Sequence, residues 1–332
     1  MSSTVQPLPS GRPLLSVRDV TMAFPGKRRG RDPVRAVDGI SFDVAAGETL
    51  GLVGESGCGK STTGRMIVRL LEPTTGSITY DGHDISHLSQ RELKPLRREL
   101  QMVFQDPHSS LNPRQTVARI ISDPLLAQGS SQAAARKRAA ELMDLVGLIP
   151  EHIDRYPHEF SGGQAQRIGI ARSLATSPRL VVADEPVSAL DVSVQAQIVN
   201  LMERLQQELG LAYLFIAHDL SVVKRVCDRV AVMYLGRIVE IGDKERVYAA
   251  PAHPYTRALL SAVPLPDPAA ERARERITLL GDPPSPAAPP PGCTFHPRCA
   301  KAQALCRTEA PLLRIAAPGE PREVACHFPE AA

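Results

Sequence analysis

Residues 54 to 61 read GESGCGKS and match the phosphate-binding pattern GxxxxGK[ST] without a mismatch. The glycines let the backbone curl, so that its N–H groups point inward at phosphate oxygens. Lys60 is expected to reach the β- and γ-phosphates of a nucleotide, and Ser61 to offer its hydroxyl to Mg²⁺. Cys58 occupies a free position of the pattern, and we assign it no chemistry. The residues expected to bind the nucleotide are Gly54, Glu55, Ser56, Gly57, Cys58, Gly59, Lys60, Ser61 and Thr62.

A second candidate is a pair of acids that follows an apolar run. Leu180 to Ala183 reads LVVA and is followed by Asp184 and Glu185. In this arrangement the first acid helps to hold Mg²⁺ at the end of a strand. The second acid is placed to polarise an attacking water as a general base. Strands often end in Asp, so the pair gains its meaning only from the phosphate-binding loop.

These motifs need a strand before the loop and a helix after it, and the sequence provides both. Thr49 to Val53 (TLGLV) is an apolar, strand-sized run, and a helix is expected from Ser61 to Leu71, ending before Pro73. Strands alternating with helices predict an α/β core with a mostly parallel sheet. Further strands are expected at 14–24, 40–44, 180–183, 211–217, 230–234 and 237–241, and further helices at 131–146, 161–175, 194–209 and 252–262.

Composition narrows the class of protein. The chain has 332 residues, which favours about two domains, and its net charge of +3 disfavours nucleic acid as the main partner. No apolar run approaches the roughly 20 residues that span a bilayer. The N-terminus lacks a signal peptide, so the chain is expected to remain in the cytosol and to reach a membrane only through partners. Residues 1 to 12 are expected to be disordered.

The string Phe160-Ser161-Gly162-Gly163-Gln164 restricts the type of nucleotide-binding protein. Ser161 alone could be a simple helix N-cap. The whole string resembles LSGGQ, the signature of the ATP-binding subunits of ABC transporters, with Phe160 in place of the usual Leu. The resemblance runs from about residue 14 to residue 249, with the family's motifs in the family's order.

This resemblance implies roles for single residues. Gln105 matches the Q-loop glutamine, Asp191 lies in the D-loop, and His218 matches the switch histidine. Catalysis would fall to Glu185, His218 and Gln105, and Mg²⁺ binding to Ser61, Gln105 and Asp184. Phe24 is the candidate for stacking on adenine, next to a basic insertion at 26–33.

The resemblance also implies a P-loop fold and a two-chain mechanism. The expected P-loop NTPase core has a mixed or parallel sheet and spans 13–250, with a helical subdomain at about 88–176. Two chains would sandwich two ATP molecules, and Ser161, Gly162, Gly163 and Gln164 of one chain would act on the partner's ATP. A helix N-terminus facing the γ-phosphate suits an anion.

The C-terminal residues 251–332 resemble the extension of oligopeptide/dipeptide importer ATPases, including a proline-rich linker at 282–292. This implies a second ATPase subunit, expected to be a different chain, two permeases and an extracytoplasmic peptide-binding protein. The chain would sit peripherally on the cytoplasmic side of the inner (plasma) membrane. Nickel or glutathione remains an alternative cargo, and a soluble ABC ATPase outside transport is a further alternative. A GTP-binding switch is disfavoured, because no NKxD string is present.

Four cysteines, Cys293, Cys299, Cys306 and Cys326, cluster near the C-terminus with the spacing C-x₅-C-x₆-C-x₁₉-C. A cytosolic protein keeps thiols reduced, so a metal or cluster site is favoured over disulfides. The spacing is wider than that of zinc knuckles, and four thiolates can bind a larger cubane. Similar tails in peptide-importer ATPases imply a structural [4Fe-4S] cluster. A zinc site, with His296 and His327 nearby, and free thiols remain alternatives.

Overall fold

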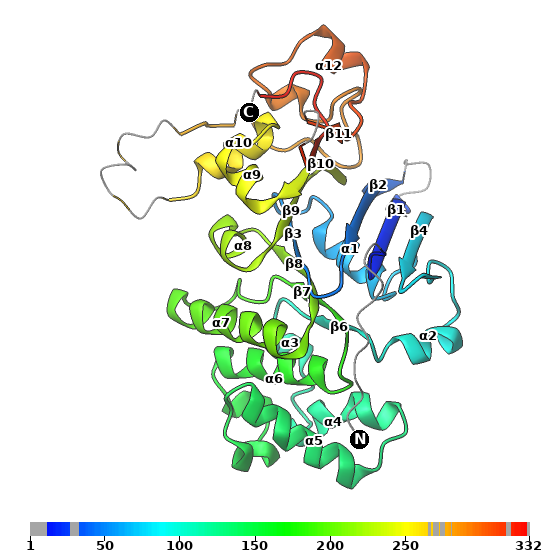
Figure 1. Cartoon of the computed structure of the whole chain (residues 1–332), viewed down its shortest axis with the longest axis vertical. Helices are drawn as coiled ribbons and strands as arrows, with labels where there is room; N and C mark the ends of the chain where they lie inside the picture. Colours follow the sequence, from blue (N-terminus) through cyan, green and yellow to red (C-terminus); the bar gives the residue numbers. More distant parts are fainter. Residues whose placement is uncertain are drawn as a thin grey trace.

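A computed structural model of the chain describes residues 12–26, 33–264, 267, 272, 276–279, 281–316 and 320–330 (Figure 1). The expectations for the N-terminal residues 1–11 and for most of the basic insertion, 27–32, lie outside the described residues. Among the described residues, no helix is long and apolar enough to cross a membrane.

The centre of the molecule is an eight-stranded sheet with the order β11-β12-β10-β9-β3-β8-β7-β6. Parallel pairing joins β6, β7, β8, β3 and β9, and antiparallel pairing joins β9 to β10, β10 to β12 and β12 to β11. The predicted α/β class is confirmed, with a mixed sheet. The strands are β3 (Thr49–Val53), β6 (Leu100–Val103), β7 (Leu180–Asp184), β8 (Ala212–Ala217), β9 (Arg229–Tyr234), β10 (Arg237–Asp243), β11 (Arg314–Ile315) and β12 (Arg322–Val324).

A second, four-stranded sheet with the order β2-β1-β4-β5 is antiparallel throughout. Its strands are β1 (Leu15–Phe24), β2 (Val34–Val44), β4 (Thr75–Tyr80) and β5 (His83–Asp84). One face of the central sheet packs against this sheet and against α1 (Lys60–Ile67), with Leu50 and Leu52 of β3 in that core. Because side chains alternate along a strand, Val53 belongs to the core on the opposite face.

The opposite face of the central sheet is covered by helices, several of which form the lower end of the molecule in Figure 1. There α4, α5 and α6 pack against one another, and α6 also contacts α7. The remaining helices are α2 (Gln90–Leu96), α3 (Pro107–Ser110), α4 (Val117–Ala127), α5 (Gln132–Leu145), α6 (Gly162–Leu174), α7 (Val192–Leu209), α8 (Leu220–Val226), α9 (Lys244–Ala249), α10 (Pro254–Ser261) and α12 (Ala304–Thr308), with short 3₁₀ turns η1 (Pro150–Asp154), η2 (Pro157–Glu159) and η3 (His296–Arg298).

The C-terminal segment returns to the central sheet. Its strand β12 pairs with β10, so that Val324 faces Glu240 and Arg322 faces Gly242. Figure 1 shows this segment (orange to red) above β9 and β10, beside α9 and α10. Phe295, which stands between Cys293 and Cys299, packs against Tyr234 at the end of β9, and β9 is the direct neighbour of β3 in the sheet.

Candidate functional site

The phosphate-binding loop follows β3 directly, and α1 begins at Lys60. Gly54 and Gly59 have φ angles of 156° and 108°. A Cβ atom on Gly54 would lie 2.1 Å from the Met233 carbonyl oxygen, and one on Gly59 would lie 2.2 Å from the Ala36 carbonyl oxygen. The backbone of this loop is therefore packed so closely that only glycine fits at either position.

Lys60 is almost fully buried, with 4% of its surface exposed. Its Nζ atom donates hydrogen bonds to the carbonyl oxygens of Gly54 at 2.8 Å and of Glu55 at 2.9 Å. The ammonium group thus lies over the loop, where this motif brings a lysine to phosphate oxygens.

Asp184 lies at the end of β7 and is 1% exposed. Ser61 donates a hydrogen bond from Oγ to its Oδ1 atom at 2.7 Å. Burial raises the pKa of the Asp184 carboxyl. A divalent cation would favour its charged form, and a carboxylate next to a hydroxyl is the hard-oxygen donor pair that Mg²⁺ prefers.

Glu185 follows Asp184 with a φ angle of 46°, in the left-handed region that non-glycine residues rarely adopt. Its backbone N–H donates to the Ile216 carbonyl at 2.9 Å, which holds it against β8. Its Oε2 atom accepts a hydrogen bond from Gln105 Nε2 at 2.8 Å and lies 3.3 Å from His218 Nδ1. Strained residues of this kind collect at functional sites.

The loop, the glutamine, the second acid and the histidine line one open pocket. Its lining residues are Ala36, Ser56, Gly57, Gly59, Lys60, Ser61, Thr62, Gln105, Glu185 and His218. Of the other predicted residues, Gly54, Glu55, Cys58 and Asp184 contact Lys60 or Ser61. Phe24 lies at the end of β1 and is not among the lining residues. Ala36 was not predicted, because an alanine carries no chemical signal in a sequence.

The signature residues lie outside this pocket. Ser161 is exposed and caps α6: its Oγ atom accepts from Gln164 N–H at 3.4 Å, while Gln164 Oε1 accepts from Ser161 N–H at 3.0 Å. A Cβ atom on Gly163 would lie 2.4 Å from Val194 Cγ1, so this glycine permits the close contact between α6 and α7. Asp191 likewise caps α7 by accepting from Val194 N–H at 3.0 Å.

The four C-terminal cysteines line a single small pocket, together with the histidines His253, His296 and His327. Cys293 N–H donates to the Cys306 carbonyl at 2.8 Å. Burial, together with the charges of the other three cysteines, raises the pKa of Cys326 to about 11. Within the described residues, no group of three or more His, Cys, Asp or Glu side chains is arranged to hold a metal ion. The four thiols therefore line one pocket, but in the described residues they do not form a metal-binding arrangement.

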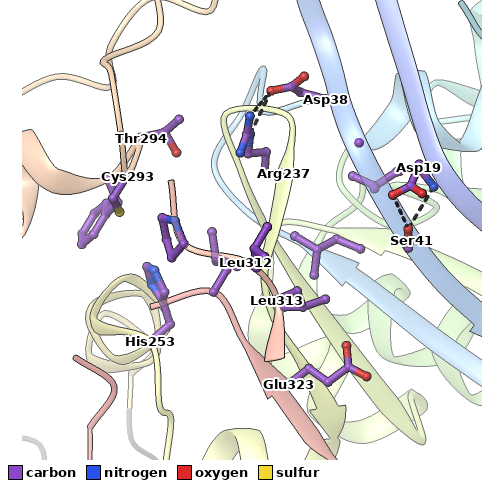
Figure 2. A pocket seen from close by; sticks show the side chains of 18 residues that line it. Asp19, Asp38, Ser41, Arg237, His253, Cys293, Thr294, Leu312, Leu313 and Glu323 are labelled. Carbon is purple, nitrogen blue, oxygen red and sulfur yellow. Dashed lines mark hydrogen bonds and ion pairs between the residues drawn. The ribbon is translucent and has the colours of Figure 1, made fainter. Parts of the chain in front are cut away.

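A further pocket is lined by residues of β1, β2 and β10 and by parts of the C-terminal segment (Figure 2). Its polar groups are largely paired with one another. Arg237 forms an ion pair with Asp38, with Nη2 2.7 Å from Oδ2, and Asp19 Oδ1 accepts from Ser41 Oγ at 3.3 Å. Asp19 and Glu323 leave this pocket with a net negative charge, which disfavours phosphates, so the nucleotide is expected in the pocket at the phosphate-binding loop.

Comparison with known proteins agrees with the motifs. The family model "ABC transporter" matches residues 37–188, and the model "Oligopeptide/dipeptide transporter, C-terminal region" matches residues 239–306. The oligopeptide transport ATP-binding protein AppF of Bacillus subtilis is 53% identical over 321 residues, covering 95% of this chain and 97% of AppF.

Solved structures of ATP-binding cassettes share the fold. A dimeric post-hydrolysis state of the cassette MJ0796, bound to ADP and Pi, has a TM-score of 0.63 and 29% identity, covering 69% of this chain and 98% of that one. The cbiO1 protein of Clostridium perfringens, part of the ABC transporter complex cbiONQ, also has a TM-score of 0.63 and 29% identity, covering 71% and 91%.

Proposed function

The chain belongs to the ATP-binding subunits of ABC transporters, of the oligopeptide/dipeptide type, and from this premise we propose that it hydrolyses ATP to energise the import of di- and oligopeptides. One observation carries the proposal: Lys60, Ser61, Gln105, Glu185 and His218 line the same pocket, although they come from segments far apart in the sequence.

Each residue has a chemical task in this pocket. Lys60 and the loop N–H groups bind the phosphates, with the N-terminus of α1 behind them. Ser61 and Asp184, with Gln105, would hold Mg²⁺, which neutralises charge on the phosphates when it is bound. Glu185 accepts a proton from the attacking water, and Gln105 and His218 orient its carboxylate through the contacts described above.

The second half of each ATP site is proposed to come from a partner chain. Ser161 is exposed on its own chain and does not line the pocket, which suits a contact made across an interface. The partner is proposed to be a second ABC ATPase, a different chain. Phe24 is proposed to stack on adenine.

Transport requires membrane chains in addition to this one. We infer two permease subunits and an extracytoplasmic peptide-binding protein, with this chain bound peripherally on the cytoplasmic side of the plasma membrane. The core is proposed to span 13–250, with the helical subdomain at 88–176 and the extension at 251–332.

Reconstitution tests this function directly. The chain, co-expressed with the permease and ATPase genes that neighbour it, is placed in liposomes, and uptake of labelled di- and oligopeptides is followed with added binding protein and ATP. Peptide uptake that needs ATP supports the proposal. ATP-dependent uptake of nickel or glutathione without peptide uptake would contradict the assigned cargo.

We further propose that Cys293, Cys299, Cys306 and Cys326 bind a structural [4Fe-4S] cluster. Support comes from the donor set, because four thiols line one pocket. Four thiolates are the usual ligand set of a cubane cluster. When bound, the cluster supplies covalent cross-links to a segment with few buried apolar residues. Zinc is the alternative metal.

Anaerobic purification decides between these metals. A cluster gives a brown protein with about four irons and four acid-labile sulfides per chain, and replacement of Cys306 by Ser removes most of both. A colourless protein with one zinc and no iron would contradict the cluster. The buried Cys227, replaced by Ser, is the matched control and should leave the iron content unchanged.

A further inference from the structure

Glu55, the second residue of the phosphate-binding loop, is held by the C-terminal segment. Arg298 forms a bidentate ion pair with its carboxylate, with Nη1 2.9 Å from Oε2 and Nη2 3.1 Å from Oε1. The Arg298 side chain is 7% exposed and that of Glu55 is 25% exposed. Two parallel charge-assisted hydrogen bonds in a largely buried setting fix orientation as well as distance.

The backbone of Glu55 is held as firmly as its side chain. Its N–H group donates to the hydroxyl of Tyr255, a fully buried residue of α10, at 2.9 Å. Its carbonyl oxygen accepts from Lys60 Nζ at 2.9 Å. Thus one residue connects the C-terminal segment to the lysine that is proposed to bind the phosphates.

An aromatic group joins these contacts to the cysteine pocket. Tyr234, at the end of β9, has its ring centroid 4.7 Å from that of Tyr255 and 5.2 Å from that of Phe295. Phe295 is 2% exposed, stands between Cys293 and Cys299 in the sequence, and lines the cysteine pocket. The cysteine pocket, the aromatic group and the loop are therefore continuous through packed side chains, which resist independent movement.

We propose that Arg298 and Tyr255 are positioning residues for the phosphate-binding loop: the C-terminal extension fixes Glu55 and thereby presets the loop for the nucleotide. This inference rests on the proposed ATP-binding function. Its physical basis is preorganisation, since a loop already held in its binding conformation loses less entropy when the phosphates bind. The extension therefore affects ATP affinity without touching ATP.

A double-mutant cycle on the full chain tests the proposal. Arg298→Met, Glu55→Gln and the double variant are compared by the Kd for MgATP and by the thermal unfolding of the nucleotide-free chain. Because the pair holds the loop in its binding conformation before the nucleotide arrives, its loss leaves the loop to be ordered on binding, and each single variant is expected to weaken MgATP binding about tenfold. In the Glu55→Gln background, Arg298→Met should add less than about twofold, since its partner is already neutral.

Conservative variants and a matched control separate positioning from general stability. Arg298→Lys keeps the charge and should recover part of the affinity, and Tyr255→Phe, which removes only the hydroxyl, should weaken MgATP binding while keeping the aromatic packing. Arg257→Met is the control: Arg257 lies on α10 like Tyr255, but its ion pair is with Glu330 at 3.4 Å and not with a residue of the loop. It should leave the Kd for MgATP unchanged.

Two results would overturn the inference. One is a Kd for MgATP within about twofold of wild type in folded Arg298→Met and Glu55→Gln chains, even if their unfolding temperatures fall. The other is an Arg298→Met effect that persists in full on the Glu55→Gln background, because Arg298 would then act by another route. If the proposed ATP-binding function were itself wrong, the wild-type chain would not bind MgATP, and this result is distinct from the two above.

Discussion

Lys60 carries the most direct residue-scale prediction. Its ammonium group is the cation held over the loop by the carbonyls of Gly54 and Glu55. In Lys60→Ala the phosphates lose this cation, so ATP affinity should fall roughly a hundredfold, which corresponds to about 3 kcal/mol. Equilibrium binding of MgATP measures this loss. Lys94→Ala, an exposed position on α2, should bind as the wild type does, and a Lys60→Ala affinity within a factor of about three of wild type would contradict the role.

Glu185 should separate binding from hydrolysis. Glu185→Gln keeps the size of the side chain but removes the proton acceptor, so turnover should fall by roughly 10²- to 10⁴-fold while ATP still binds. The measurement is ATPase rate at saturating ATP in the assembled transporter. Glu141→Gln, which removes an exposed carboxylate on α5, is the control. Unchanged turnover in Glu185→Gln would exclude it as the general base.

Single residues were predictable where a motif fixes type and spacing together. Lys60, Glu185 and His218 follow from such strings and meet in one pocket. Arg298 and Tyr255 were not predicted to contact the loop, because their partner Glu55 lies 243 and 200 positions away in the sequence. The residues that neighbour an arginine or a tyrosine in the sequence carry no signal of a contact with a residue so far away along the chain.

At the scale of elements, the N-terminus of α6 has two tasks that mutation can separate. Ser161 caps its own helix and is proposed to contact the partner's ATP. Ser161→Arg should leave ATP binding to its own chain intact and block hydrolysis at the partner's site. Ser131→Arg is the control, because Ser131 caps α5 in the same way. Turnover should survive there, since Ser131 is not proposed to contact ATP.

The test is to determine which of the two ATP sites Ser161→Arg inactivates, that of the mutant chain or that of its partner. Chains carrying Ser161→Arg are combined with a wild-type ATPase partner, and nucleotide trapped at each site is identified. A defect confined to the phosphate-binding loop of the mutant's own chain would contradict action across the interface. Loss of activity in Ser131→Arg of the same size would point to helix stability instead.

Elements with strong periodicity were the predictable ones. The strand Thr49–Val53 and the end of the helix at Leu209 have their expected bounds, because TLGLV is wholly apolar and Gly210 ends the helix with a φ of 65°. The helix expected to reach Leu71 ends at Ile67, and Arg69 adopts a φ of 54°. There Arg69 is buried and donates to the Ile85 carbonyl at 2.7 Å, a tertiary contact that overrides local propensity.

Other elements carry weak local signals. The strand Thr75–Tyr80 and the helix Val117–Ala127 were not predicted: TGSITY has glycine within it, and the helix contains Pro124. Each is stabilised by its partners, β1 for the strand and α5 and α6 for the helix. Strand β12, only three residues long, exists because the open edge of β10 gives it a partner.

At the scale of the whole molecule, a buried ion pair joins the extension to the core. Arg322 of β12 is 1% exposed and Glu240 of β10 is fully buried, with Nη1 3.7 Å from Oε1. Glu240 also accepts from the N–H groups of Ala252 and His253 at 2.8 and 2.9 Å, just before α10. The pair therefore holds together the sheet, the strand added by the extension and the start of α10.

Removing the Arg322 guanidinium should lower the free energy of unfolding. Arg322→Met leaves the Glu240 carboxylate buried with two N–H donors but no counter-charge, so the free energy of unfolding should fall by about 3 kcal/mol. Urea denaturation of the nucleotide-free chain measures this. Arg257→Met breaks an exposed pair in the same region and should cost less than about 1 kcal/mol. If the free energy of unfolding fell equally in Arg322→Met and Arg257→Met, the buried Arg322–Glu240 pair would contribute no more to stability than the more exposed Arg257–Glu330 pair.

The loss in Arg322→Met should also depend on pH, with a definite sign. Burial raises the pKa of the Glu240 carboxyl, while hydrogen bonds from the Thr256 side chain and from the Ala252 and His253 N–H groups, and the charge of Arg322, act to lower it. Without Arg322, the folded-state pKa rises further above the unfolded value, so the folded chain binds the proton more tightly than the unfolded chain does. Protonation then relieves the penalty, and the difference from wild type should shrink as the pH falls from about 7 to about 5. Adding Glu240→Gln to Arg322→Met should remove the part of that pH dependence that comes from Glu240, while the carboxylate of Glu320, which also pairs with Arg322 at 2.8 Å, is still present. A difference that grows toward low pH would instead mean that the carboxylate is stabilised by its N–H donors alone.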